Sequence, residues 1–269
     1  MYDGTAARST FIEGKNCWRR VHADRAAFIV DGAAYFDAFG RAALRAKKSI
    51  IIVGWDFDSR TLLWPENAPP HVPATLGDFL NFLVKRTPGL RVFVLDWDFP
   101  MIYVDREFPP VFGLGWRHRR RIHLRFDNQH PVGGSHHQKV VVIDEALAFA
   151  GGIDLAIGRW DTPEHLAHDP RRNLGDKVCH PVHDLMMLVD GEAAFNLARL
   201  AKERWRMATG KKLRRTGCDN DPWPEGVQPD LHNAALAISR TVPAYKKRTE
   251  VREIEALFLD LIAAANKHI

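Results

Sequence analysis

Residues 136–154 read HHQKVVVIDEALAFAGGID, and this stretch decides the fold class of the chain around it. Its apolar runs are bounded by polar residues and by a glycine pair, which is typical of short strands. We therefore expect one strand over 138–144 and a second over 146–150. The polar residues at the start of the first strand and the glycines after the second then lie close to one another.

Helical and strand-like segments alternate on both sides of this stretch. The residues 50–53 form a continuous apolar run, as expected of a strand that is buried on both faces. The predicted helices are 33–48, 76–86 and 192–205, and the further strands are 28–30, 49–54, 91–96 and 183–190. This alternation predicts an α/β fold in which a central mixed β-sheet is flanked by helices on both faces.

The composition of the 269 residues is that of a globular protein with a modest positive charge of +5. Such a charge suits an anionic partner, such as a lipid headgroup, a membrane surface or nucleic acid. The cysteines are few and widely spaced, so that we expect neither a disulfide framework nor a zinc–cysteine cluster. Residues 1–10 lack the apolar core of a signal peptide and the apolar runs are short, so we expect neither a signal peptide nor a transmembrane segment, and a cytoplasmic or peripheral membrane location.

Chemically active residues surround the first predicted strand. His137 and Lys139 are two residues apart, and so point to the same face of a strand. A neutral imidazole is a nucleophile or a proton carrier, and an ammonium group stabilises negative charge on a phosphate oxygen. Asp144 has the opposite parity, so we expect it at the strand end in a supporting role. Gly151 and Gly152 allow backbone to approach the site closely.

Taken together, the pattern His137-x-Lys139-x4-Asp144-x6-Gly151-Gly152 resembles the HKD motif of the phospholipase D superfamily. The flanking sequence is also similar to phospholipases D proper. The similar segments, some of which look like those of bacterial phospholipases D, are 54–59 (GWDFDS), 136–144, 151–155, 158–161 (GRWD) and 182–184 (VHD).

The resemblance implies a two-step cleavage of a phosphodiester without a metal or other cofactor. His137 would be the nucleophile that forms a phosphohistidine, Lys139 a phosphate ligand and Asp144 a supporting carboxylate, and these three are the expected catalytic set. By the same resemblance, Asp154 lies on the phosphate side of the site. Asp184 would form a hydrogen bond that orients the histidine.

The chain departs from the family in one respect, because it contains no second His-x-Lys-x4-Asp sequence. In the family, the histidine of a second HKD motif protonates the leaving alcohol. We therefore expect residues 1–210 to form a phospholipase D-like lobe, the first copy of a duplicated fold. Residues 211–250 would be a solvated connector, and 251–269 the start of a truncated second lobe.

The expected function is phospholipase D or transphosphatidylase activity that converts phospholipids into phosphatidic acid. The expected partners are phospholipid, a membrane surface and a second HKD lobe, which would be a missing C-terminal half or a second copy of the chain; nucleic acid is not expected. Two alternatives remain open, a homodimeric nuclease or other phosphodiesterase, and a non-catalytic lobe that binds lipid or a partner chain. The arginine-rich segment 117–125 fits either a phosphate-binding surface or a solvated face.

Overall fold

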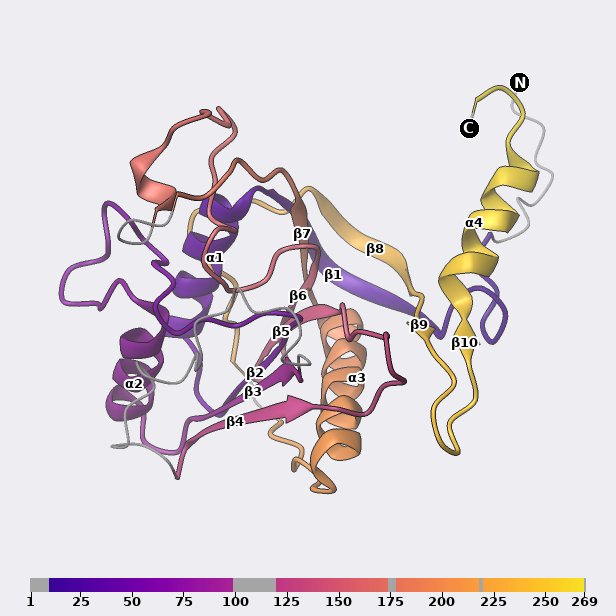
Figure 1. The fold of residues 1–269 in the computed structure, drawn as a ribbon, viewed down its shortest axis with the longest axis horizontal. Helices are drawn as coiled ribbons and strands as arrows, with labels where there is room; N and C mark the ends of the chain where they lie inside the picture. Colours follow the sequence, from indigo (N-terminus) through magenta and orange to yellow (C-terminus); the bar gives the residue numbers. More distant parts are fainter. Residues whose placement is uncertain (1–9, 99–119, 174–177, 218–219, 269) are drawn as a thin grey trace.

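A computed structural model describes residues 10–98, 120–173, 178–217 and 220–268. Within them, an eight-stranded sheet has the order β4-β3-β2-β5-β6-β7-β1-β8. β2, β3 and β4 are parallel to one another, whereas the other neighbours pair antiparallel. The sheet is therefore mixed, and Figure 1 shows α1 and α2 on one side of it and α3 on the other. This confirms the predicted α/β fold class.

The elements follow the predicted alternation closely, and their bounds are as follows. The strands are β1 Arg19–Val30, β2 Ser49–Val53, β3 Arg91–Trp97, β4 Ile122–Asp127, β5 Lys139–Ile143, β6 Leu147–Gly151, β7 Leu185–Asp190, β8 Leu231–Ile238, β9 Thr241–Val242 and β10 Val251–Arg252. The helices are α1 Gly32–Leu44, α2 Leu76–Arg86, α3 Gly191–Thr209 and α4 Glu253–Ala264, and a short 3₁₀ helix covers Pro170–Arg172.

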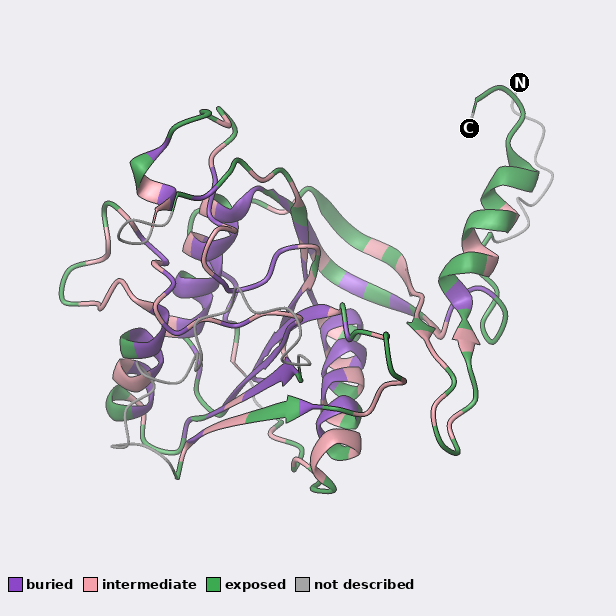
Figure 2. Cartoon of the chain, in the orientation of Figure 1, coloured by how far each residue is buried: buried purple, intermediate pink, exposed green. Residues whose placement is uncertain are grey.

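Two apolar cores lie on the two faces of the sheet, and side-chain alternation along the strands supplies both. In β2, Ile50 and Ile52 belong to the core beneath α1 and α2, whereas Ile51 and Val53 belong to the core beneath α3. Every residue of β2 and β5 is buried (Figure 2). These central strands therefore read as continuous apolar runs because both of their faces are covered.

The range 211–250 contributes to the fold more than a solvated connector would. β8 lies within it and pairs with β1 as an edge strand of the main sheet, from Arg19↔Ile238 to Ala26↔Leu231. Trp223 packs into the core beneath α1 and α2. The expectation of a loop is therefore wrong for residues 231–238. The division of the chain into two lobes at this range stays a prediction.

α4 lies apart from the sheet at one end of the molecule and is mostly exposed (Figures 1 and 2). Four large apolar side chains on it, Phe258, Leu259, Leu261 and Ile262, are each 47% exposed or more. The helix is attached by Asp260, whose carboxylate accepts hydrogen bonds from Lys15 and Asn16. Among the described residues, no helix has the length and apolar character needed to span a membrane.

Candidate active site

The predicted strand containing the chemistry is β5, and its start lies at the carboxyl ends of β2 and β3. β5 runs antiparallel to β2, with Val140 opposite Val53, so its first residue, Lys139, lies where β2 ends. On its other side, Lys139 pairs with Gly151 of β6. His137 precedes the strand by two residues. The sheet register therefore gathers His137, Lys139 and the glycine pair at one edge.

Lys139 is a buried cation held by one carboxylate. Its Nζ lies 2.8 Å from Oδ2 of Asp154, and the two residues are 6% and 2% exposed. The other oxygen of Asp154 accepts a hydrogen bond from the backbone N–H of Trp55 at 2.9 Å. An ammonium group has three donors. With Asp154 as its one ion-pair partner among the described residues, Lys139 keeps donors for a phosphate oxygen.

Trp55 is a site residue whose role the sequence did not reveal. Its ring centroid lies 5.8 Å from that of His137 and 5.6 Å from Nζ of Lys139. It also stacks on Trp97, at 5.7 Å between ring centroids. The indole therefore lies beside both His137 and Lys139. Its place directly after β2 was the available signal, since ligands bind at strand ends in such sheets.

The electrostatic surroundings of His137 favour a neutral imidazole. Burial lowers the pKa of His137 below that of a free histidine, and the charges of Lys139 and Arg159 lower it further. The pKa of Lys139 is also lowered, first by burial, while the charge of Asp154 opposes that shift. Arg159, in the GRWD segment, is thus a further cation near both residues. The sequence pattern alone did not indicate a role for Arg159.

The glycine pair permits close approach, as the sequence suggested. A Cβ on Gly151 would lie 2.3 Å from the backbone oxygen of Leu185, and a Cβ on Gly152 would lie 2.1 Å from the carboxylate of Asp184. Asp184 therefore occupies the space above Gly152, and its negative charge acts on His137. Its Oδ1 accepts a hydrogen bond from the backbone N–H of Leu185. A hydrogen bond to His137 is not among the contacts of the described residues.

Asp144, in contrast, lies just beyond the far end of β5 from Lys139, about 16 Å away at the rise of an extended strand. Its carboxylate accepts hydrogen bonds from the backbone N–H groups of Lys47, Lys48 and Ser49, at 2.7–2.8 Å. Asp144 therefore fixes the connection between α1 and β2. This is the strand-end, supporting position expected from its parity, remote from His137 and Lys139, which lie together. The assignment of Asp144 to the catalytic set stays a prediction.

His136 is buried on the other side of the chain from this site and contacts a carboxylate there. Its Nε2 lies 3.3 Å from Oδ1 of Asp127, which in turn forms an ion pair with Arg204 of α3. These interactions lower the pKa of Asp127 to about 2, against the opposing effect of burial. His136 therefore belongs to a buried polar cluster with Asp127 and Arg204 beneath α3.

A groove among the described residues lies elsewhere. It has a volume of about 910 Å³ and is lined by Lys48, Arg91, Trp205 and Arg214, among others. These residues surround the amino ends of β2 and β3, opposite the edge that carries His137. The groove also includes Arg125, whereas the earlier arginines of the basic segment, through residue 119, and Trp116 lie outside the described residues.

The sequence matches a known family over this site. Residues 119–223 match the family model described as Phospholipase D. The curated relatives include phospholipase D C of Dictyostelium discoideum, 29% identical over 66% of this chain and 12% of the relative. They also include phospholipase D beta 1 of Arabidopsis thaliana, 30% identical over 70% of this chain and 21% of the relative. The chain thus spans about a tenth to a fifth of the length of these two relatives.

Solved structures with a related fold show lower sequence identity. One is Nuc from Salmonella typhimurium, a phospholipase D family member, with a TM-score of 0.44, 15% identity and coverage of 70% of this chain and 99% of that one. Another is phosphatidylserine synthase from Haemophilus influenzae Rd KW20, with a TM-score of 0.41, 14% identity and coverage of 71% and 40%.

Proposed function

We propose that the chain carries a phosphodiesterase domain of the phospholipase D superfamily with a single HKD motif, and that this domain is the nucleophilic lobe of a phospholipase D. In this proposal His137 attacks the phosphorus of a phosphatidyl ester. The observation that carries it is the meeting of His137 and the buried Lys139–Asp154 pair at the ring of Trp55.

The chemistry proceeds in two displacements. The lone pair of neutral His137 forms an N–P bond while the P–O bond to the headgroup alcohol breaks, and that alcohol leaves with a proton from a second acid. Water or another alcohol, giving its proton to the conjugate base of that second acid, then attacks phosphorus, the N–P bond breaks, and a phosphatidic acid or a new phosphodiester is released while His137 is restored. Lys139 stabilises the negative charge on the phosphoryl oxygens in both steps.

A second lobe would supply the proton donor. This chain has one His-x-Lys-x4-Asp sequence, and the described residues near His137 contain no second histidine paired with a lysine in this way. The exposed apolar side chains of α4, led by Phe258 and Leu259, support the presence of a further packing partner. We propose a C-terminal HKD lobe as that partner, with a second copy of this chain as the alternative.

The proposed substrate is a membrane phospholipid whose headgroup is an alcohol. The curated relatives reported above are named phospholipases D, and the positive charge of +5 suits an anionic membrane surface. We accordingly propose attachment to the membrane periphery. The reported relatives come from eukaryotes, and the finer resemblance to bacterial phospholipases D stays a prediction.

The leaving group provides the test of this proposal. An aryl ester such as bis(p-nitrophenyl) phosphate releases an anion that needs no proton, so that His137 alone can complete the first step. We expect the purified chain to release a burst of one p-nitrophenolate per chain and then stall. Phosphatidylcholine, whose alcohol must be protonated, should be cleaved only after a C-terminal HKD lobe is added.

Three results would contradict the proposal in different ways. A lack of any burst with the aryl ester would favour a non-catalytic lobe. Turnover of phosphatidylcholine by the chain alone, rising with the square of its concentration, would favour a dimer with two His137 residues. Cleavage of DNA without cleavage of phospholipid would favour a nuclease.

The fall of the burst rate at acidic pH should reflect the environment of His137. Because burial and the neighbouring cations lower its pKa, the imidazole loses its proton below the ordinary value of 6.5. The neutral form is the nucleophile, so the burst rate should be independent of pH near 7 and fall only as the solution is acidified below that value. Rapid-quench measurements in which p-nitrophenolate is read after raising the pH would show this. A fall centred above 6.5 would contradict it.

A further inference from the structure

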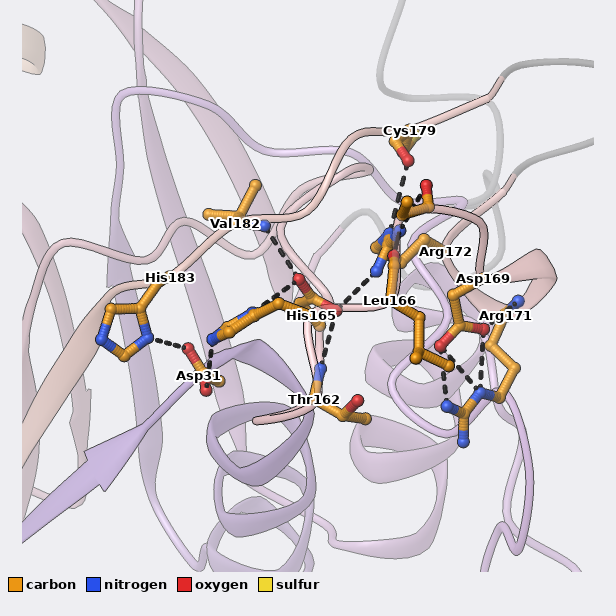
Figure 3. A network of polar contacts seen from close by, with 12 residues as sticks. Asp31, Thr162, His165, Leu166, Asp169, Arg171, Arg172, Cys179, Val182 and His183 are labelled. Carbon is orange, nitrogen blue, oxygen red and sulfur yellow. Dashed lines mark hydrogen bonds and ion pairs between the residues drawn. The ribbon is translucent and has the colours of Figure 1, made fainter.

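Three metal-ligand side chains converge outside the phosphodiester site. They are Asp31 in the β1–α1 turn, His165 in the segment between β6 and β7, and His183 just before β7, and their ligand atoms all lie within 4.8 Å of one another (Figure 3). Nδ1 of His183 is 2.8 Å from Oδ1 of Asp31, and Nε2 of His165 is 3.5 Å from Oδ2. One carboxylate therefore faces two imidazole rings.

Asp31 has an unusual conformation for an aspartate at the start of a helix. Such a residue commonly accepts a hydrogen bond from the first turn, but Asp31 makes no side-chain cap of α1. Its backbone has φ 68° and ψ 157°, a combination that is almost confined to glycine. The strained backbone turns the carboxylate away from the helix and toward the histidines.

The carboxylate of Asp31 is also incompletely satisfied. The residue is 1% exposed, and its Oδ2 has no hydrogen-bond partner among the described residues. A buried carboxylate oxygen without a partner is costly, because the water that solvated it has been removed. This oxygen points into the space between the rings of His165 and His183, where a cation would satisfy it (Figure 3).

His165 is held in a suitable orientation by a second carboxylate. Its Nδ1 lies 3.0 Å from Oδ2 of Asp161, which is fully buried and also accepts from the backbone N–H of Val182. Oδ1 of Asp161 pairs with Arg172 at 2.6 Å. A carboxylate on one ring nitrogen fixes the tautomer that presents the lone pair of the other nitrogen, as in carboxylate–histidine–zinc sites.

We propose that Asp31, His165 and His183 bind a divalent transition-metal ion of the Zn²⁺ class. Two imidazole nitrogens and one carboxylate oxygen are a zinc-type ligand set, whereas Ca²⁺ and Mg²⁺ prefer oxygen ligands. The ligand atoms of a tetrahedral zinc ion lie about 3.3 Å apart, given bonds of about 2.0 Å. The site reaches that spacing by small side-chain movements. The side chain of His183 is 69% exposed, which leaves a coordination position open to solvent.

The metal would add side-chain bonds between three segments that the backbone already brings together, since β1 pairs with β7 and the N–H of Ala33 donates to the carbonyl of Asp161. The backbone N–H of Asp31 donates to the carbonyl of Asp184, the residue that follows His183. The carboxylate of Asp184 fills the space over Gly152 and acts electrostatically on His137. The proposed ion therefore has a structural role at the edge of the catalytic site, and takes no part in the phosphodiester chemistry itself.

Calorimetric titration of the tag-free, metal-stripped chain with zinc chloride tests this site without any activity measurement. We expect one Zn²⁺ per chain and a higher thermal midpoint when zinc is present. His183→Ala and His165→Ala should each weaken binding at least about 100-fold, because each removes a ligand. His232→Ala, which removes an exposed histidine of β8, is the matched control and should bind as the unaltered chain does.

Thermal unfolding in the presence of a chelator shows whether each variant is folded, and His183 is exposed enough for its replacement to leave the fold intact. Cobalt(II) provides a second readout, since a tetrahedral nitrogen–oxygen site gives intense visible absorption that His183→Ala should abolish. An unaltered chain that binds no zinc would overturn the proposal. So would zinc binding that survives either histidine substitution.

Discussion

Replacing His137 by alanine is expected to remove both the aryl-ester burst and any phospholipid turnover, by about 10⁴-fold or more. The loss should be this large because the imidazole forms the bond to phosphorus, and no other residue of the described site can take that role. Lys139 is a cation paired with Asp154, and Trp55 has no nucleophile. Stopped-flow measurement of p-nitrophenolate, combined with mass spectrometry of the acid-labile phosphorylated peptide, would establish the loss.

His180→Ala is the matched control for this substitution. His180 is exposed and lies in the segment before β7, so its removal should leave the burst intact. Both variants should unfold at the same denaturant concentration as the unaltered chain, since His137 contributes little packing. A burst of normal amplitude in the His137→Ala protein would show that another group attacks phosphorus.

The sequence predicted the parts of the site that lie within one strand pair. The spacing of His137 and Lys139, and the glycine pair that follows β6, are local patterns. Their meaning depends only on strand alternation and on the pairing of neighbouring strands. The same local logic located Asp144 at a strand end. Local patterns could not identify the hydrogen-bond partners of Asp144. The N–H groups that donate to its carboxylate belong to a segment almost a hundred residues earlier in the chain.

The parts that the sequence did not reveal depend on contacts between distant segments. Trp55 reaches His137 only because β2 pairs with β5, a pairing that no local pattern specifies. Likewise, Asp31 meets His183 through the pairing of β1 with β7. β8 was missed for a different reason. It is an edge strand with small and half-exposed side chains, so its hydrophobic pattern is weak.

The replacement of Asp144 by alanine should cause the largest loss of stability among single substitutions near the motif, about 3 kcal/mol. The carboxylate accepts from three consecutive backbone N–H groups, those of Lys47, Lys48 and Ser49, and from the side chain of Asn220. Its loss leaves donors without partners at a position that is 1% exposed. Urea unfolding, followed by circular dichroism, should show a lower midpoint with an unchanged slope.

Two further variants separate the hydrogen bonds from backbone strain. Asp144 has a φ of 54°, which alanine adopts less readily than aspartate or glycine. Asp144→Gly relieves that strain but also lacks the carboxylate, so it should remain destabilised by most of the same amount. Asp24→Ala removes a 74% exposed carboxylate and should leave the midpoint nearly unchanged. If Asp144→Gly restored full stability, the effect of Asp144→Ala on the free energy of unfolding would come from backbone strain and not from lost hydrogen bonds. The connection between α1 and β2 would then hold without its carboxylate.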